Sequence, residues 1–190
     1  VKLDTISPFM MLVIGLREAK AGNWEKASDA FGKLPQSQLN QILRPLILGW
    51  TSIAKGKVNI GAASFSKISE KEGFEILGLL HLGLGYQIAG EVDKADTAFE
   101  KALLRNTVPP DRLKISIAAH YARSGRLTLA QKIIKTLNQD DVDTTALNII
   151  LEEETKALSK EVFINDASDG LAEALFDISQ ALKNDLTGEL

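Results

Sequence analysis

The sequence predicts an all-α fold built from repeated helical hairpins, and three observations in its 190 residues indicate this. Four glycines end apolar helical stretches at intervals of 34, 34 and 35 residues, namely Gly22, Gly56, Gly90 and Gly125. A small residue stands seven positions before and five positions after each glycine. A large apolar residue stands nine positions after each one. A fixed period of this length is typical of stacked supersecondary units.

Each period is interpreted as two antiparallel helices that meet at the glycine. Glycine reaches the left-handed backbone conformation that ends a helix without a Cβ clash. The small residues mark positions where the two helices of a hairpin approach closely: Gly15, Gly49, Gly83 and Ala118 before the turn, then Ala27, Gly61, Ala95 and Ala130 after it. The large residues are expected to fill the space between successive hairpins: Phe31, Phe65, Phe99 and Ile134. Because one hairpin cannot bury its apolar face alone, neighbouring hairpins must stack.

The third period carries a family resemblance at seven signature positions: Leu79, Leu82, Gly83, Tyr86, Ala95, Phe99 and Ala102. On these residues the sequence resembles the tetratricopeptide repeat (TPR) family. The resemblance implies a right-handed α-α superhelix, a TPR solenoid, whose first helices line a concave groove. The chain departs from the family where Gly61 replaces alanine, where Ile134 replaces an aromatic residue, and where the proline that usually closes a repeat is absent or displaced.

Two stretches, KLPQSQLNQILRPLI and DGLAEALFDISQAL, also resemble exported bacterial TPR proteins of unassigned function. This narrower resemblance favours a periplasmic or exported location over a cytoplasmic one.

The period divides the chain into three parts. Residues 1–137 are expected to form four hairpins. Residues 138–165 break the period and are interpreted as an acidic helix over about residues 142–158, followed by a turn-rich loop. Residues 166–190 read as the first helix of a further, truncated repeat, because Leu175, Ile178, Ser179 and Leu182 have the expected spacing.

Composition and charge exclude several classes of function. The chain contains no cysteine, which excludes disulfides and thiolate metal sites. Its longest apolar run, residues 76–90, is shorter than the roughly 20 residues that a membrane span needs. Residues 1–137 carry 19 Lys and Arg against 12 Asp and Glu, while residues 138–190 carry 3 against 13. The basic residues alternate with acids and lack clustered aromatics, so no nucleic-acid partner is expected.

The sequence offers no arrangement of residues that would make an enzyme, and no cofactor or metal is predicted. The two histidines, His81 and His120, fall in the first helices of different hairpins without a nearby acidic partner, and both are interpreted as structural. Asp140, Asp141 and Asp143 lack the glycine and glutamate that complete a calcium loop.

The predicted groove is apolar. The TPR resemblance places eleven candidate partner-binding residues on it: Phe9, Leu12, Leu16, Leu46, Trp50, Ile53, Leu77, Leu80, Leu84, Gln87 and Arg123. The Lys, Asn and Arg clamp of the TPR modules that bind chaperone C-termini is absent. Each large apolar side chain left in water would forgo roughly 1.5–3 kcal/mol of burial, so the groove is expected to be covered.

Two hypotheses of function follow. In the first, the chain is a protein-interaction scaffold that binds an apolar or amphipathic segment in its groove, with Trp50 as the anchor. In the alternative, it is a structural spacer of a larger TPR protein whose groove is covered by helix 142–158 or by a homodimer partner. The expected partner is thus a protein or peptide, with the chain's own C-terminal helix and a second copy among the candidates.

Overall fold

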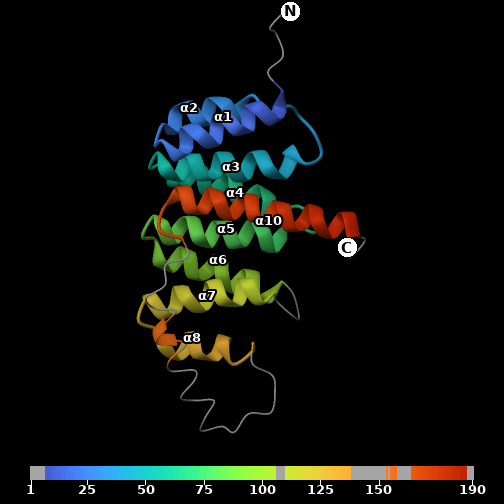
Figure 1. The fold of residues 1–190 in the computed structure, drawn as a ribbon. Helices are drawn as coiled ribbons and strands as arrows, with labels where there is room; N and C mark the ends of the chain where they lie inside the picture. Colours follow the sequence, from blue (N-terminus) through green and yellow to red (C-terminus); the bar gives the residue numbers. More distant parts are fainter. Residues whose placement is uncertain (1–6, 106–109, 138–152, 154, 158–163, 188–190) are drawn as a thin grey trace, which may run out of the picture. The chain divides into compact units, whose positions relative to one another are not determined.

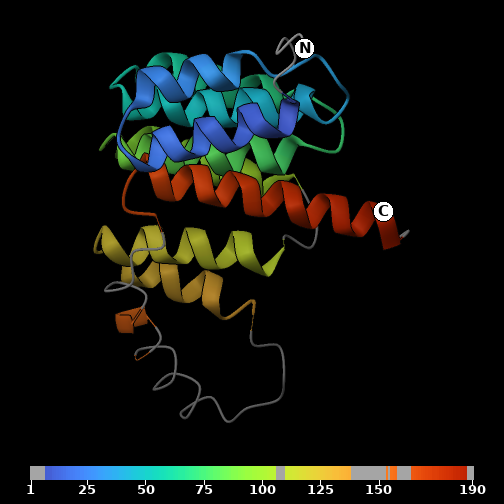
Figure 2. The same ribbon diagram turned by 45° about the horizontal axis from the view of Figure 1, so that its top comes forward.

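The computed structural model describes residues 7–105, 110–137, 153, 155–157 and 164–187, and within them the chain forms α-helices joined by turns, without a strand. Figures 1 and 2 show these helices. The predicted all-α class is confirmed. The chain divides into two compact units, which are described separately below: Val1–Ala98 with Ile164–Leu190, and Phe99–Phe163.

Unit 1 contains the first two hairpins, the helix that follows them and the last helix of the chain. Its helices are α1 (Pro8–Lys20), α2 (Trp24–Gly32), α3 (Asn40–Ala54), α4 (Val58–Ser69), α5 (Glu75–Ile88), the start of α6 (Val92–Leu104), and α10 (Ala167–Thr187). Helices α1 and α2 pack as a pair, as do α3 and α4, and each pair packs on the helix that follows it. The predicted pairing of neighbouring helices is therefore present in this unit.

Unit 2 contains the end of α6 and the fourth hairpin, α7 (Asp111–Arg123) with α8 (Leu127–Ile134). Helices α7 and α8 pack against each other. Phe99, Ile117 and Ile134 are buried in this unit, where the ring of Phe99 lies edge-on to the ring of His120, with the two ring centres 5.0 Å apart.

The hairpin turns are the helix ends that the glycine period predicts. The backbone φ angles of Gly22, Gly56, Gly90 and Gly125 are 75°, 70°, 75° and 76°. At Gly22 the glycine N–H donates to the Ala19 carbonyl, and the next N–H donates across the turn to the Glu18 carbonyl. This pair of bonds is a Schellman motif, and the other three turns repeat it. Gly73, which the period did not single out, also has a positive φ of 79°, in the turn between α4 and α5.

Glycines also set how closely the helices of a hairpin approach. A Cβ added to Gly49 on α3 would lie 2.5 Å from Cε1 of Phe65 on α4, and one added to Gly15 would lie 2.2 Å from Cε1 of Phe31. A Cβ on Gly61 would meet the carbonyl oxygen of Gly49 at 2.8 Å. The predicted close approach is confirmed at these positions. Phe31 and Phe65 each pack on the glycine of their own hairpin. From the sequence they were expected to fill the space between successive hairpins.

The C-terminal region forms one long helix. Helix α10 starts at Ala167, inside the stretch that the sequence predicts as the first helix of a further repeat. Asp166 caps it, because its Oδ1 accepts hydrogen bonds from the backbone N–H groups of Ser168 (2.7 Å) and Asp169 (3.1 Å). The expected helix 142–158 lies outside the described residues except at positions 153 and 155–157. The further repeat expected over residues 166–190 stays a prediction.

Candidate functional site

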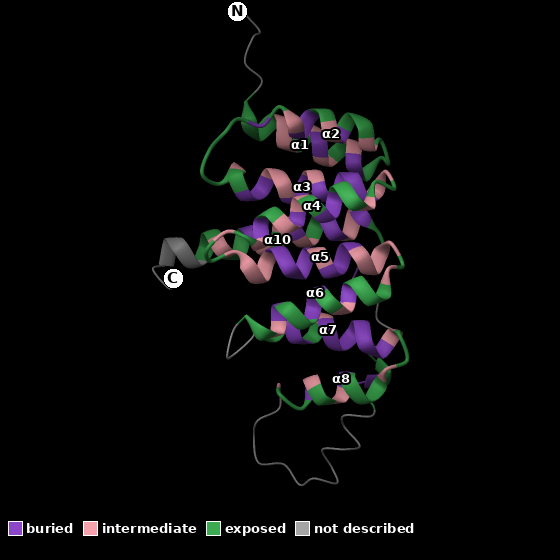
Figure 3. Cartoon of the chain, turned by 180° about the vertical axis from the view of Figure 1, so that it is seen from behind, coloured by how far each residue is buried: buried purple, intermediate pink, exposed green. Residues whose placement is uncertain are grey.

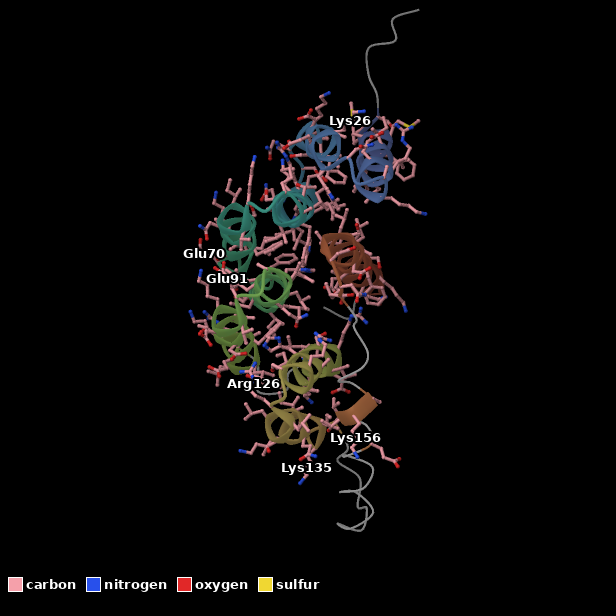
Figure 4. All side chains as sticks on the ribbon, turned by 90° about the vertical axis from the view of Figure 1, so that its left-hand side faces the viewer. Lys26, Glu70, Glu91, Arg126, Lys135 and Lys156 are labelled. Atoms are coloured by element: carbon pink, nitrogen blue, oxygen red, sulfur yellow. The ribbon has the colours of Figure 1, made fainter. Side chains whose placement is uncertain are left out.

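In unit 1, α10 lies along α3 and α5, the helices on which the sequence places most of the predicted groove. Helix α10 packs against both α3 and α5. Viewed end-on, α10 lies on the side of these helices opposite to α4 (Figure 4). Long stretches of α3 and α5 are buried (Figure 3). We call this arrangement the α3–α5 groove, with α10 as its occupant.

Trp50 of α3 lies against α10 and is completely buried. Its ring packs at a tilt on Phe65, with ring centres 5.3 Å apart. Its indole Nε1–H donates a hydrogen bond of 3.1 Å to Nδ1 of His81 on α5. A buried indole N–H usually has such an acceptor, because burying it without one costs free energy. This bond therefore fixes the tryptophan side chain and ties α3 to α5.

Gly170 of α10 lies directly against Trp50. A Cβ at this position would come within 2.4 Å of three ring atoms of Trp50, namely Cε3, Cζ3 and Cη2. Real Cβ atoms do not approach a heavy atom so closely. The absence of a side chain at Gly170 is thus what allows α10 to pack on the indole.

His81 connects the groove to its occupant. Because Nδ1 accepts from Trp50, the ring carries its proton on Nε2. That atom lies 3.2 Å from Oδ2 of Asp177 on α10. The His81 side chain is completely buried and that of Asp177 is 14% exposed. The sequence interpretation that His81 lacks an acidic partner is wrong, because folding brings together two residues far apart in the chain.

The face that α10 presents to the groove is made of small and apolar residues. Its buried positions recur at helical spacing, and they are Ala167, Gly170, Leu171, Ala174 and Ile178. Exposed residues such as Ser179 and Lys183 occupy the other side. Helix α10 is therefore amphipathic, with Asp177 the acid among its groove-facing residues.

The eleven residues predicted for partner binding fall into four sets. Five are buried on α3 and α5, where α10 packs: Leu46, Trp50, Ile53, Leu80 and Leu84. Leu77 and Gln87, also on α5, are partly buried. On α1, Leu12 and Leu16 are partly buried and Phe9 is 74% exposed. Arg123 belongs to unit 2, where partial burial lowers the pKa of its guanidinium below the usual value. A binding role for these residues stays a prediction.

The described residues place α10 on α3 and α5. The hypothesis that helix 142–158 covers the groove falls outside the described residues, apart from positions 153 and 155–157, and stays a prediction. Sequence reasoning missed Gly170 and Asp177 as groove residues. An isolated glycine inside the Ala- and Leu-rich helix was the available signal, since glycine destabilises a helix interior unless packing requires it.

Two of the hollows among the described residues of unit 1 lie beside α10. One, of about 410 Å³, borders Trp24, Ile53 and the start of α10 at Asp166. The other, of about 460 Å³, is mainly apolar and borders Leu39, Phe74 and Leu182. Among the described residues, no three His, Asp or Glu side chains gather closely enough to hold a metal ion. None of the described helices has the length and apolar character to cross a membrane.

Comparison of the chain with protein-family models, with curated proteins and with solved structures finds no match. The fold and the groove themselves define the class at the level that the structure supports: an all-α chain of paired helices in which a later amphipathic helix fills the groove of earlier ones.

Proposed function

We propose that the chain is a non-enzymatic, TPR-like interaction scaffold whose α3–α5 groove binds an amphipathic helix. The observation that carries the proposal is α10 itself, which lies in the groove with Gly170 packed on the buried Trp50. Helix-in-groove recognition places the apolar face of one helix in an apolar channel between others. In this proposal α10 is the intramolecular occupant of that site.

The groove needs an occupant for energetic reasons. The five buried candidate residues on α3 and α5 include one tryptophan and four large aliphatic side chains. Leaving a side chain of this size in water forgoes roughly 1.5–3 kcal/mol of burial. Helix α10 also brings Oδ2 of Asp177 to 3.2 Å from Nε2 of His81, a polar contact that a wholly apolar segment could not make.

The same contact favours a second candidate, a structural spacer whose groove is permanently filled by its own chain. An occupant on the same chain has a high effective concentration, of the order of mM for short flexible connections, so an external helix must compete with it. The two functions differ in whether the groove accepts a helix supplied from outside.

The test replaces Gly170 in the full chain with leucine. The chain also carries Trp24→Phe, so that tryptophan fluorescence comes from Trp50 alone. The added side chain collides with Trp50, so we expect α10 to leave the groove and Trp50 emission to shift to longer wavelength. A peptide with the unaltered sequence of residues 164–187 should then restore the original emission. Gly32→Leu is the matched control, because a Cβ there meets nothing within 4 Å.

Circular dichroism of the variant checks that the remaining helices are intact. A folded Gly170→Leu chain that exposes Trp50 and binds no helical peptide would overturn the interaction proposal and favour the spacer.

A further inference from the structure

We infer that α10 opens from α3 and α5 as one unit while the hairpins beneath it stay folded, and so acts as a cover that controls access to Trp50. The inference concerns α10 itself and holds whether or not the groove accepts a helix from outside. Three features of the contact carry it: few large side chains on α10, a buried polar atom without a hydrogen bond, and hollows at both ends of the contact.

The contact face of α10 is made largely of small residues. Of the five buried positions described in this helix, three are alanine or glycine, and Leu171 and Ile178 carry the large apolar side chains. Two further large residues, Phe176 and Leu182, are 40% and 41% exposed. Helix α3, in contrast, buries six large apolar side chains. Because stabilisation by burial follows the apolar area, α10 is held less firmly than α3 is.

The contact also encloses a polar atom that has no partner. Nε2 of His81 is buried and makes no hydrogen bond among the described residues, although Oδ2 of Asp177 lies 3.2 Å away. A buried donor without an acceptor costs free energy, and water can bind it once the helix lifts. Hydration of this atom therefore offsets part of the apolar burial that opening removes.

Packing is incomplete at both ends of the contact. One hollow, of about 410 Å³, borders the start of α10 at Asp166. Another, of about 460 Å³, borders Phe74 of the α4–α5 turn and Ala181 of α10. An interface with hollows of this size makes fewer van der Waals contacts than a close-packed one. The ends of the contact thus add less to its stability than the centre, where Gly170 packs on Trp50.

The hairpins do not depend on α10 for their own contacts. Helix α3 packs on α4, and α4 on α5, and these contacts remain when α10 leaves. Trp50 would lose its cover on the side of Gly170, but it would keep its hydrogen bond to His81 and its contact with Phe65. Elements with few buried contacts open at a lower free energy than the rest of a protein. The open state is therefore a folded set of hairpins with Trp50 accessible.

Native-state hydrogen exchange of the full chain at increasing urea tests the inference. We expect the backbone amides from Leu171 to Ile178 to share one opening equilibrium constant, about 10-fold or more above that of the α3 amides. Their opening should also depend less on urea, since it exposes less surface than unfolding of α3 does. The same constant and urea dependence for α10 and α3 would overturn the inference. A gradient that falls from Ile178 to Leu171 would overturn it too, because it would show fraying from the helix end.

A matched pair of variants tests whether incomplete packing permits the opening. Ala181→Leu places a larger apolar side chain in the hollow beside Phe74, and it should lower the opening constant of α10 about 5- to 10-fold. Ala172→Leu adds the same side chain at an exposed position and should leave the constant unchanged. Exchange of the α3 amides shows in both variants that the hairpins are intact. An opening constant that Ala181→Leu does not lower would overturn the inference.

Discussion

Trp50 shows how one residue can join three helices. Its ring belongs to α3, its hydrogen-bond acceptor to α5, and Gly170, which packs on the ring, to α10. The indole is thus packed as a core residue and also positions the imidazole of His81. The TPR resemblance predicts its groove location, but it does not reveal the acceptor, because the sequence gives His81 only a structural role.

We expect Trp50→Phe to destabilise the chain by about 1–3 kcal/mol, since the smaller ring leaves Nδ1 of His81 without its donor. Urea denaturation followed by circular dichroism measures the change. Trp24→Phe is the control, because Trp24 is half-buried on α2 and should change stability by less than about 0.5 kcal/mol. An equal loss for both variants would contradict a special role of the indole N–H.

At the scale of the element, the hairpins are held by close contact between a glycine of the first helix and a phenylalanine of the second. Gly49 on Phe65 and Gly15 on Phe31 repeat the same contact one period apart. Both rings are completely buried. The distance between the two helices is therefore set by a missing side chain.

Gly49→Ala should cost about 1–3 kcal/mol, because its Cβ would lie 2.5 Å from the Phe65 ring and force the helices apart. Gly32→Ala adds the same methyl group where nothing lies within 4 Å. That control should be neutral or stabilising by about 0.4–1 kcal/mol, because it reduces the freedom of the unfolded chain. Thermal unfolding of the two variants gives the comparison, and a Gly49→Ala chain as stable as the control would refute the contact.

The hairpins could be predicted from the sequence, whereas the position of α10 could not. A positive φ strongly favours glycine, so the turns could be predicted from the glycines alone, at Gly22, Gly56, Gly90 and Gly125. The spacing of apolar residues in α10 also predicts an amphipathic helix. The same face can pack on a neighbouring hairpin or in a groove, however, and no local signal distinguishes these. The choice depends on contacts such as Asp177 with His81, which are remote in sequence and follow no period.

At the scale of the whole molecule, stability is expected to be regional. In repeat architectures each element contacts mainly its neighbours. The free energy of unfolding is then a sum of contributions from single repeats and from the interfaces between adjacent ones. Both tryptophans belong to unit 1, while the buried Ile134 belongs to unit 2. Tryptophan emission therefore reports on one unit, and far-UV circular dichroism reports on all helices.

Ile134→Ala should remove about 2–5 kcal/mol of local stability by leaving a cavity in unit 2. We expect part of the far-UV circular dichroism signal to be lost at a lower urea concentration than in the unaltered chain. The urea midpoint of the change in tryptophan emission should stay the same. Leu46→Ala in α3 is the converse variant, and it should lower the emission midpoint. Identical shifts of both signals in both variants would show a single cooperative unit instead.

The contact between Trp50 and Gly170 also has a consequence for biosynthesis. The ribosome must add 82 residues after Ile88, the last residue of α5, before Gly170 is made. At about 5–20 residues per second this takes about 4 to 16 s, during which α3 and α5 can fold while their apolar surface has no cover. We expect the nascent chain to be prone to aggregation during this interval. Slowing translation after α5 should lengthen that exposure and increase aggregation.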